Sequence, residues 1–478
     1  MRKRKERGVA VVFAALLLLV LIPMVGLGVD GGVAFMLRAR LSAAVDAAVL
    51  AGARSLNAGA DVQSQAANAT AVAQRYFNAN LPPGTWGSQN PTYNVSVKQD
   101  SQYVRSVSMT ASIDAPLYFM GVLGHRTAHI AITGKAQRRN VNVMLVLDRS
   151  YSMGAYIDSG GNSGWCGKCG SIPNMIAAAS EFVNQFAQGS DNVGMVAFGG
   201  NYYLAPPSTN FSSLAGQIAN ISSSGNTGSA QALWVAYNAL ATLPDANGQP
   251  NGQPGALNVI LFFTDGLPNG ITANFAPYRF SPDNCAKGSN SMVGWIAQTH
   301  GFVDPGPTNG LFNIIATSVS DPNDGSMSEL IPDRSGCNFG ANSSLIYKDF
   351  SQIPPVDYYG NLTNEGMYNQ PPYKTVNLAA ISQPSQVGAA SANAADYVAQ
   401  RWRAGAINNI VPLVYTISLL DNPAEVPDPV FLNRVANSIN SPIYDSTKPT
   451  GLYINTNSAD QLPAAFQQIA SKVLQLSQ

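Results

Sequence analysis

The chain has 478 residues, enough for two or three domains. Its 27 basic residues balance its 27 acidic residues, and charged residues make up only 11% of the total. This composition lacks the basic excess typical of nucleic-acid-binding proteins, so no nucleic-acid partner is expected.

The N-terminal end has the composition of a membrane anchor. A basic cluster at residues 2–7 precedes 21 uncharged residues, from Val9 to Val29. As a helix this run would measure about 30 Å, the thickness of the hydrocarbon core of a bilayer. A cleaved signal peptide is the alternative, but the run is long for one and Asp30 follows without an Ala-x-Ala site. We therefore expect residues 1–30 to form a cytoplasmic basic tail and an uncleaved transmembrane anchor.

The charges on either side of this run predict its orientation. Basic residues favour the cytoplasmic side, and the cluster at residues 2–7 outweighs Arg38 and Arg40 beyond the run. The protein should then cross the inner (cytoplasmic) membrane once, with its N-terminus in the cytoplasm and its bulk periplasmic or extracellular. Without residues 1–29 the chain keeps 22 basic and 26 acidic residues, a net charge near −4.

Residues 31–140 are expected to form a helical stalk and a small antiparallel sheet. An apolar residue recurs every fourth position on one helical stripe, formed by Leu37, Leu41, Val45 and Val49. The small residues of segment 41–53 would let helices approach closely, either beside a membrane or within the protein's own domain.

A second helix is predicted from about Val62 to Asn78, because Pro82, Pro83 and Gly84 end the pattern. Residues 90–138 then alternate between apolar and polar side chains, which predicts strands packed on that helix.

From Val141 to the end of the chain, buried strands alternate with helices. Runs of Val, Ile, Leu and Phe predict main strands at 141–148, 192–198, 257–264 and 410–419, with short strands near 202–205 and 452–455. Helices are predicted at about 172–188, 211–220, 229–243, 429–438 and 459–475. This order predicts an α/β domain with a doubly wound, mostly parallel sheet covered on both faces.

Two insertions are expected in this domain, at about 154–171 and 266–406. The second is dense in Gly, Pro, Asn and aromatic residues, and it is too long for a structureless loop. We therefore predict an inserted subdomain that is packed by its aromatic side chains, Tyr278, Phe280, Trp295, Phe302, Phe339, Tyr358 and Tyr359.

Oxygen-bearing side chains gather where predicted strands end. Asp148, Ser150 and Ser152 follow the first strand, Asp265 follows strand 257–264, and Thr227 precedes a helix. The carboxyl ends of the strands of a doubly wound sheet line one edge, where ligands bind. Because hard divalent cations take oxygen ligands, these five residues form a candidate metal site. The alternative is that Asp148 caps the next segment and the serines are turn residues.

The candidate site resembles the metal-ion-dependent adhesion site of the von Willebrand factor type A domain in three segments, Asp148-Arg149-Ser150-Tyr151-Ser152, Thr227 and Thr264-Asp265-Gly266. The order of elements from Val141 to about Leu476 is similar to that fold as well. The resemblance implies that Ser150, Ser152 and Thr227 touch the metal, whereas Asp148 and Asp265 act largely through bound water. It also implies an open metal position for an acidic side chain of a protein partner, and no enzymatic activity. Mg²⁺ is the expected cation, with Mn²⁺ and Ca²⁺ as alternatives.

The first part of the chain resembles the N-terminal region of TadG-like proteins of the bacterial Tad (Flp-type) pilus-assembly system. The resemblance lies in residues 7–14, the apolar run and residues 46–53. A pilin-type processing site would place Glu five residues after Gly8, where this chain has Phe13, so assembly into a fibre as a pilin subunit is not expected. The two resemblances together imply metal-dependent binding or adhesion, with pilus or envelope components as partners. A purely structural cell-envelope protein is an alternative.

The cysteines are disulfide candidates in an oxidising compartment, and they are Cys166, Cys169, Cys285 and Cys337. Cys166 and Cys169 also have the spacing of a thioredoxin-type motif, so a thiol–disulfide oxidoreductase is an alternative function. A four-cysteine zinc site is a further alternative. Because both insertions leave from strand ends, we expect disulfides that stiffen a cap near the metal site.

The remaining polar groups predict no further site. His125, His129 and His300 are expected in loops or on the surface, and segment 321–325 is either a calcium-binding turn or a plain surface turn. The sequence shows no Ser-His-Asp set and no phosphate-binding Gly loop, so no catalytic residues are predicted.

Overall fold

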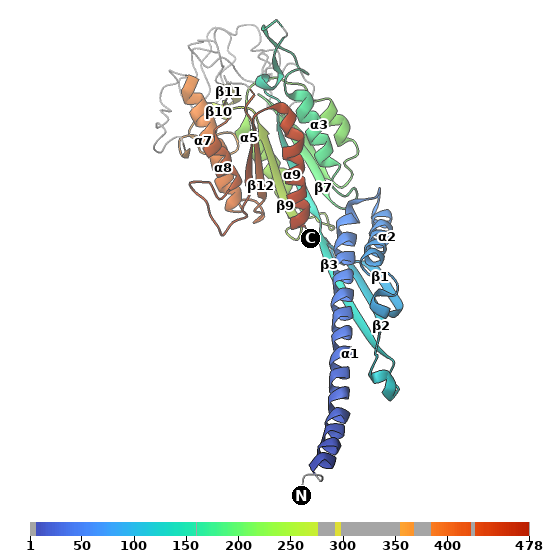
Figure 1. Cartoon of the computed structure of the whole chain (residues 1–478). Coiled ribbons are helices and arrows are strands. Elements are labelled where there is room, and N and C mark those ends of the chain that lie inside the picture. The colour runs from blue at the N-terminus through green and yellow to red at the C-terminus, as the bar shows by residue number, and fades with distance from the viewer. Residues whose placement is uncertain are drawn as a thin grey trace, which may run out of the picture. The chain divides into compact units, whose positions relative to one another are not determined.

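The computed structural model describes residues 6–158, 160–275, 292–297, 354–367, 384–421 and 426–477 (Figure 1). Contacts divide the chain into two units, Met1–Arg139 and Asn140–Ser477. Each unit has its own hydrophobic core.

The first unit combines two helices with a three-stranded antiparallel sheet of order β1-β2-β3. Its elements are α1 (Glu6–Arg54), α2 (Val62–Asn80), β1 (Gln89–Ser101), β2 (Val104–Pro116) and β3 (Thr127–Arg139). Helix α2 begins with a capping box, in which the Asp61 carboxylate accepts from Ser64 N and the Ser64 hydroxyl accepts from Asp61 N. One-turn 3₁₀ segments lie at Ser55–Asn57, Thr85–Gly87 and Met120–Leu123.

The apolar stripe predicted on the first helix packs inside its own unit. Leu37, Leu41, Val45 and Val49 are buried in a core that includes residues of α2, β2 and β3. Gly52 lets α1 approach α2 closely, since a Cβ there would lie 3.1 Å from the carbonyl oxygen of Ala69. The small residues of segment 41–53 therefore serve packing within this unit.

The second unit is built on a six-stranded sheet of order β13-β12-β9-β4-β7-β8. Neighbouring strands run parallel except β8, which is antiparallel to β7, so the predicted mostly parallel α/β sheet is confirmed. The strands are β4 (Val141–Asp148), β7 (Asn192–Phe198), β8 (Tyr202–Ser208), β9 (Leu257–Thr264), β12 (Leu413–Leu419) and β13 (Leu452–Thr456).

Helices cover both faces of this sheet (Figure 1). One face is covered by α3 (Ile172–Val183), α4 (Leu214–Ala219) and α9 (Leu462–Leu476). The other is covered by α5 (Ser229–Ala241), α7 (Pro384–Arg403) and α8 (Pro429–Ala436). The second unit also has two small antiparallel strand pairs, β5 (Ala155–Ile157) with β6 (Ser163–Trp165) and β10 (Gly270–Phe275) with β11 (Met292–Ala297).

Several predicted boundaries were wrong. Helix 172–188 ends at Val183, and a turn follows in which Ala187 N donates to the Asp191 carboxylate. Helix 211–220 begins only at Leu214, after a turn in which the Asn210 side chain accepts from the Ser212 hydroxyl. Strand 410–419 begins at Leu413, directly after a proline that lacks a backbone donor.

The assignment of residues 266–406 to a single inserted subdomain was also wrong in part. Helix α7 lies within that range, yet Val398, Ala395 and Trp402 belong to the main core beside α5. Its apolar face is built largely from alanines, which is why the hydrophobic period was inconspicuous in the sequence. Of the aromatics proposed to pack the insertion, Tyr358 and Tyr359 form an edge-to-face pair with 5.0 Å between ring centroids.

Trp295 lies on β11, where it pairs with Thr272. The remaining aromatic residues proposed for the insertion, Tyr278, Phe280, Phe302 and Phe339, lie outside the described residues. The same holds for Cys285, Cys337, His300 and segment 321–325.

Candidate metal site at the sheet edge

Two central strands deliver the carboxylates of the candidate site to one edge of the sheet. Strands β4 and β9 are parallel neighbours in a register that pairs Leu147 with Phe263. Asp148 therefore ends β4 beside Thr264, the last residue of β9, and Asp265 follows directly. Both carboxylates are buried. The parallel register thus brings together two residues that are 117 positions apart in the sequence.

Asp148 holds the turn that carries the serines. Its Oδ1 accepts from Ser150 N at 2.8 Å, and its Oδ2 accepts from the Thr264 hydroxyl at 2.6 Å. One carboxylate thus joins the turn after β4 to the end of β9. This arrangement fixes the position of Ser150 relative to Asp265.

Ser150, Ser152 and Asp265 bring three oxygen atoms into mutual contact. The two serine hydroxyls lie 3.0 Å apart, and they lie 3.3 Å (Ser150) and 3.0 Å (Ser152) from Oδ1 of Asp265. Mg²⁺ prefers six oxygens in an octahedron at about 2.1 Å, which places neighbouring ligands about 3.0 Å apart. The three atoms therefore have the spacing of one face of such an octahedron.

Thr227 lies in a loop that is bound to the serine turn. Tyr151 N donates to Gly225 O at 2.8 Å, and Ser224 N donates to Arg149 O at 2.7 Å. The Thr227 backbone N–H donates to the side chain of Asn269 at 2.6 Å. Its hydroxyl is buried and has no hydrogen-bond partner among the described residues, although buried hydroxyls normally have one.

The donor set fits a hard cation. It offers hydroxyl and carboxylate oxygens and no sulfur or imidazole, which matches the preference of Mg²⁺. Among the described residues no cluster of three His, Cys, Asp or Glu side chains is placed to hold a metal. The candidate site has only two carboxylates, and its other oxygens are hydroxyls. Ser152 is only half-buried, so this side of the site faces solvent.

The sequence analysis did not find the residues that hydrogen-bond to the loops carrying the candidate ligands. Arg149 is fully buried, and its guanidinium donates to Ser222 O and to the side chain of Asn201. The Ser223 hydroxyl donates to Ser150 O at 3.0 Å, and Asn269 accepts from Thr227 as described above. The only local signal was an arginine directly after a buried strand, which does not reveal its partners.

The hairpin β5–β6 lies beside the serine turn. Trp165 donates from Nε1 to the Ser223 hydroxyl at 3.0 Å, and Ser223 N donates to Gly167 O at 2.7 Å. Gly154 permits this close contact, because a Cβ there would lie 2.5 Å from both Cys166 O and the Ser223 hydroxyl. The predicted insertion at 154–171 is thus tied directly to the candidate site.

A disulfide joins Cys166 to Cys169 at the base of this hairpin. The pair lies between β6 and α3, as a thioredoxin-type motif also would. The loop that it closes is held to the body of the domain, since Cys166 N donates to Gly154 O. Both sulfurs are in the disulfide, so this pair does not contribute thiolates to the zinc site considered above.

The described histidines lie outside the candidate site. His125 is in the loop between β2 and β3, and His129 on β3 pairs with Asp114 at 2.9 Å.

Comparison with known proteins identifies two parts of the chain. Residues 143–267 match the family model of the von Willebrand factor type A domain. Residues 8–55 match the family model described as "Putative Flp pilus-assembly TadE/G-like". The chain therefore carries a von Willebrand factor type A domain in its second unit and a TadE/G-like segment at its N-terminal end. No curated protein matches the chain.

Several solved structures show a distant likeness. The PilB minor pilin from Streptococcus sanguinis is 14% identical with a TM-score of 0.38, and the match covers 81% of this chain and 79% of PilB. The von Willebrand factor domain of the type V pili tip protein Mfa5 from Porphyromonas gingivalis is 14% identical with a TM-score of 0.36, covering 72% and 98% of the two chains. The pilus adhesin SpaC from Lactobacillus rhamnosus GG is 13% identical with a TM-score of 0.36, and the match covers 81% of this chain but 35% of SpaC. Likeness at this level does not bear on what this chain binds.

Proposed function

We propose that the protein is a membrane-anchored adhesin-like component of a pilus-assembly system, which binds an acidic group of a protein partner through a divalent cation. Ser150, Ser152 and Thr227 would hold the cation through their hydroxyls, with Asp148 and Asp265 as the carboxylates of the site. Bound there, the cation would supply a positive charge and a coordination position for an external carboxylate. The role is one of binding and not of catalysis.

The spacing of three oxygens carries this proposal. The Ser150 and Ser152 hydroxyls and Oδ1 of Asp265 lie 3.0–3.3 Å from one another, as neighbouring ligands of Mg²⁺ do. The buried Thr227 hydroxyl supports it, since a cation would give that oxygen a partner. Because few carboxylates would touch the cation directly, it would keep a strong attraction for an external one.

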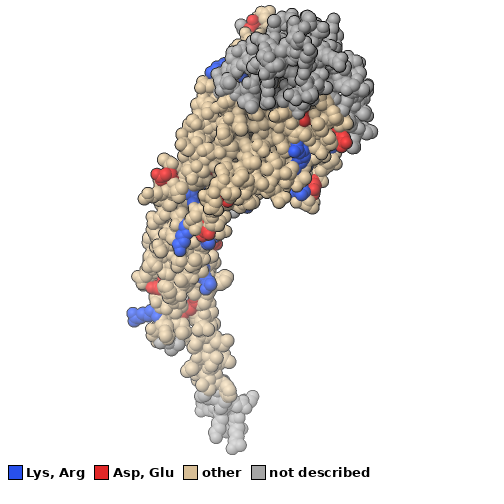
Figure 2. All heavy atoms as spheres, turned by 180° about the vertical axis from the view of Figure 1, so that it is seen from behind, with Lys and Arg blue, Asp and Glu red and all other residues tan. Residues whose placement is uncertain are grey.

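Surface charge gives little support to the alternative that a patch of charged side chains recognises the partner. On the face shown in Figure 2, acidic and basic side chains are few and scattered, with no patch of one sign. Long-range electrostatic steering depends on such patches.

Membrane anchoring forms part of the proposal. Among the described residues, α1 is the helix with the length and apolar composition needed to cross a bilayer. Its apolar residues from Phe13 to Val29 are largely exposed, as lipid-facing side chains would be. With the basic cluster at residues 2–7 in the cytoplasm, the adhesion site would lie outside it.

Mn²⁺ binding to the full chain in detergent tests the site. We expect one Mn²⁺ to bind per chain, seen as loss of the free-ion signal in electron paramagnetic resonance, and Mg²⁺ to compete for it. Asp148→Ala should remove this binding and leave the circular dichroism spectrum unchanged. Asp460→Ala serves as the control, because Asp460 is an exposed residue before α9. Equal binding by the two variants would contradict the proposed site.

Partner binding is tested with the same variants. The purified full chain should retain pilus or envelope proteins in Mg²⁺, release them in chelator, and fail to retain them as Asp148→Ala. If capture is undiminished in chelator, the cation is not the means of recognition.

A further inference from the structure

The loop between β2 and β3, residues 117–126, is bound to α1 where the apolar run of that helix ends. The buried Asp30 carboxylate accepts hydrogen bonds from three successive backbone N–H groups of the loop. They are those of Tyr118 (2.8 Å), Phe119 (3.0 Å to Oδ2) and Met120 (2.8 Å). Three such bonds to one charged acceptor hold the loop firmly at this level of the helix.

Phe119 extends this contact into the apolar run itself. Its side chain covers Gly26, where a Cβ would lie 2.5 Å from Cγ of the ring. Gly26 and Asp30 are four residues apart and so lie on one face of α1. The neighbouring residues Leu27 and Val29 remain exposed. The loop therefore covers one face of α1 at the end of the apolar run, where the neighbouring apolar side chains stay exposed.

The loop itself presents apolar side chains to its surroundings. Val122 is 87% exposed, Tyr118 is 59% exposed and Phe119 is 43% exposed. His125 and Arg126 follow and are exposed as well. An aromatic and apolar tip next to basic residues is the composition that settles at a membrane–water interface, where rings lie among headgroups and cations near phosphates.

We propose that loop 117–126 is a second membrane-contacting element, which inserts Tyr118, Phe119 and Val122 into the outer interface of the bilayer that α1 crosses. This rests on the proposed anchor. If Val9–Val29 spans the hydrocarbon core, Gly26 lies about 4.5 Å inside its outer boundary, at 1.5 Å per residue. Because the loop is fixed against Gly26 and Asp30, it must lie at the same depth. At this depth the side chains of the loop would be in contact with lipid and not with a protein partner.

The hydrogen bonds of the loop are consistent with a position in the membrane interface. Backbone groups without partners are costly where water is scarce. Asp30 satisfies the three N–H groups named above, and Leu117 N, Gly124 N and His125 N donate to carbonyls of the same loop. Asp30 therefore has a specific role, which is to let a non-helical segment enter the interface.

Depth-dependent fluorescence quenching tests the proposal on the full chain in vesicles of phosphatidylcholine and phosphatidylglycerol. Val122→Trp adds a fluorophore at the tip, and Gln102→Trp adds one in the β1–β2 turn, about 40 Å away along β2. The chain has five native tryptophans, so each variant is compared with the parent protein. With lipids brominated in the middle of the acyl chain, we expect added quenching for Val122→Trp and none for Gln102→Trp.

A second pair of variants tests the role of Asp30. In the Val122→Trp background, Asp30→Asn should lose most of the added quenching, because a neutral amide holds the three N–H groups weakly. Asp46→Asn, at an exposed position of α1, should keep it. If the chain floats with vesicles but the tip is no more quenched than Gln102→Trp, the loop proposal is overturned while the anchor stands. If the chain does not float with vesicles, the proposed anchor is wrong, and the loop proposal that rests on it is overturned as well.

Discussion

The phenol ring of Tyr151 lies parallel to the indole of Trp165, with 4.7 Å between ring centroids and 6° between planes. Tyr151 stands between the two serines of the candidate site, and Trp165 ends β6. The hydrogen bond from Trp165 to Ser223, which in turn donates to Ser150 O, makes a second connection between the same parts. The hairpin β5–β6 is therefore a rigid neighbour of the candidate site and not a free loop.

Replacing Trp165 should loosen this hairpin. Trp165→Ala removes a stacked pair worth about 0.5–1.5 kcal/mol and a hydrogen bond worth about 0.5–1.5 kcal/mol, so the local opening free energy should fall by roughly 1–3 kcal/mol. Amide hydrogen exchange at residues 155–165 would measure this. Trp165→Phe keeps a ring but loses the donor, and should show roughly half the effect. Unchanged exchange in Trp165→Ala would mean that the stack does not hold the hairpin.

Thr227→Val should separate metal binding from folding. The hydroxyl has no partner among the described residues, so losing it should leave the metal-free free energy of unfolding within about 0.5 kcal/mol, or raise it. Loss of a ligand oxygen should weaken Mn²⁺ binding by about tenfold or more, which corresponds to about 1.4 kcal/mol. Urea unfolding and Mn²⁺ titration measure the two effects.

Two further variants act as controls for Thr227. Thr227→Ser should restore metal affinity, because it returns the hydroxyl. Thr133→Val, at an exposed position of β3, should leave metal affinity unchanged. A Thr227→Val protein with wild-type affinity would remove Thr227 from the proposed ligand set.

The disulfide should be structural and modest in its effect. Cys166 and Cys169 are three positions apart, and a loop that short contributes only about 2 kcal/mol through chain entropy. The double variant Cys166→Ser with Cys169→Ser should keep its fold and lose no more than that in urea unfolding. Alkylation followed by peptide mapping should find both residues unlabelled until reductant is added. A rapidly labelled thiol at either position would instead favour the oxidoreductase alternative.

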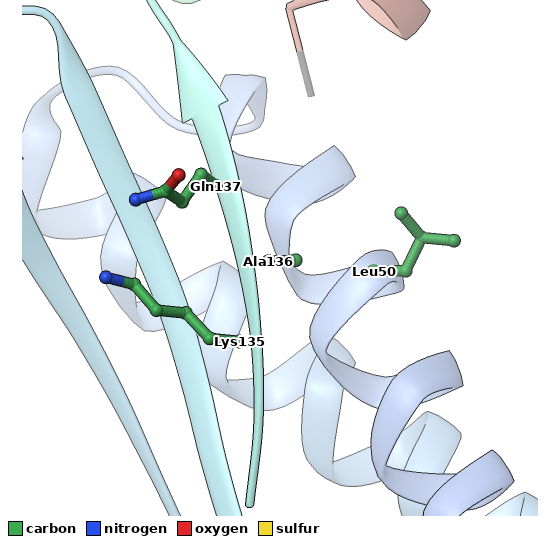
Figure 3. Close-up of a pocket in the computed structure, with 4 residues that line it drawn as sticks. All are labelled: Leu50, Lys135, Ala136 and Gln137. Carbon is green, nitrogen blue, oxygen red and sulfur yellow. The ribbon is translucent and has the colours of Figure 1, made fainter.

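The small sheet of the first unit should be sensitive to acid through Asp100. Hydrogen bonds from Lys135 (2.7 Å), Gln137 (2.8 Å) and Ser106 (2.9 Å) lower the pKa of the Asp100 carboxyl from 3.8 to about 2. Figure 3 shows the Lys135 and Gln137 side chains pointing to the same side of β3, away from Leu50. A carboxylate with a lowered pKa stabilises the fold above its unfolded pKa, and this contribution is lost as the pH falls through the folded value.

The corresponding measurement compares Asp100→Asn with the wild type. The variant should be less stable in urea at pH 7, and the difference should shrink between pH 4 and pH 2 as the wild-type carboxyl takes up its proton. A constant difference from pH 7 to pH 2 would show that the contacts of Asp100 do not depend on its charge.

Much of the fold follows from local patterns. Strands β4 and β9 were predicted at the observed residues, because a run of buried apolar residues that ends at a polar turn leaves little choice of boundary. Helix α7 escaped prediction, since alanines such as Ala394 contribute to its buried face and a row of small residues gives only a weak hydrophobic period. Burial in α7 depends on the surface that α5 offers, which no local pattern encodes.

The sequence by itself determined the apolar run, the alternation of strands and helices, and the presence of five oxygen-bearing residues, four after predicted strands and one before a predicted helix, because each is a property of neighbouring residues. Only the tertiary structure decided which atoms meet. The contact of Ser152 with Asp265, across 113 positions, depends on the register of two strands. The hydrogen bonds from the backbone of residues 118–120 to Asp30, across 88 to 90 positions, depend on how far the β2–β3 loop extends along α1. Long-range contacts of this kind arise from packing, and no local period or propensity specifies them.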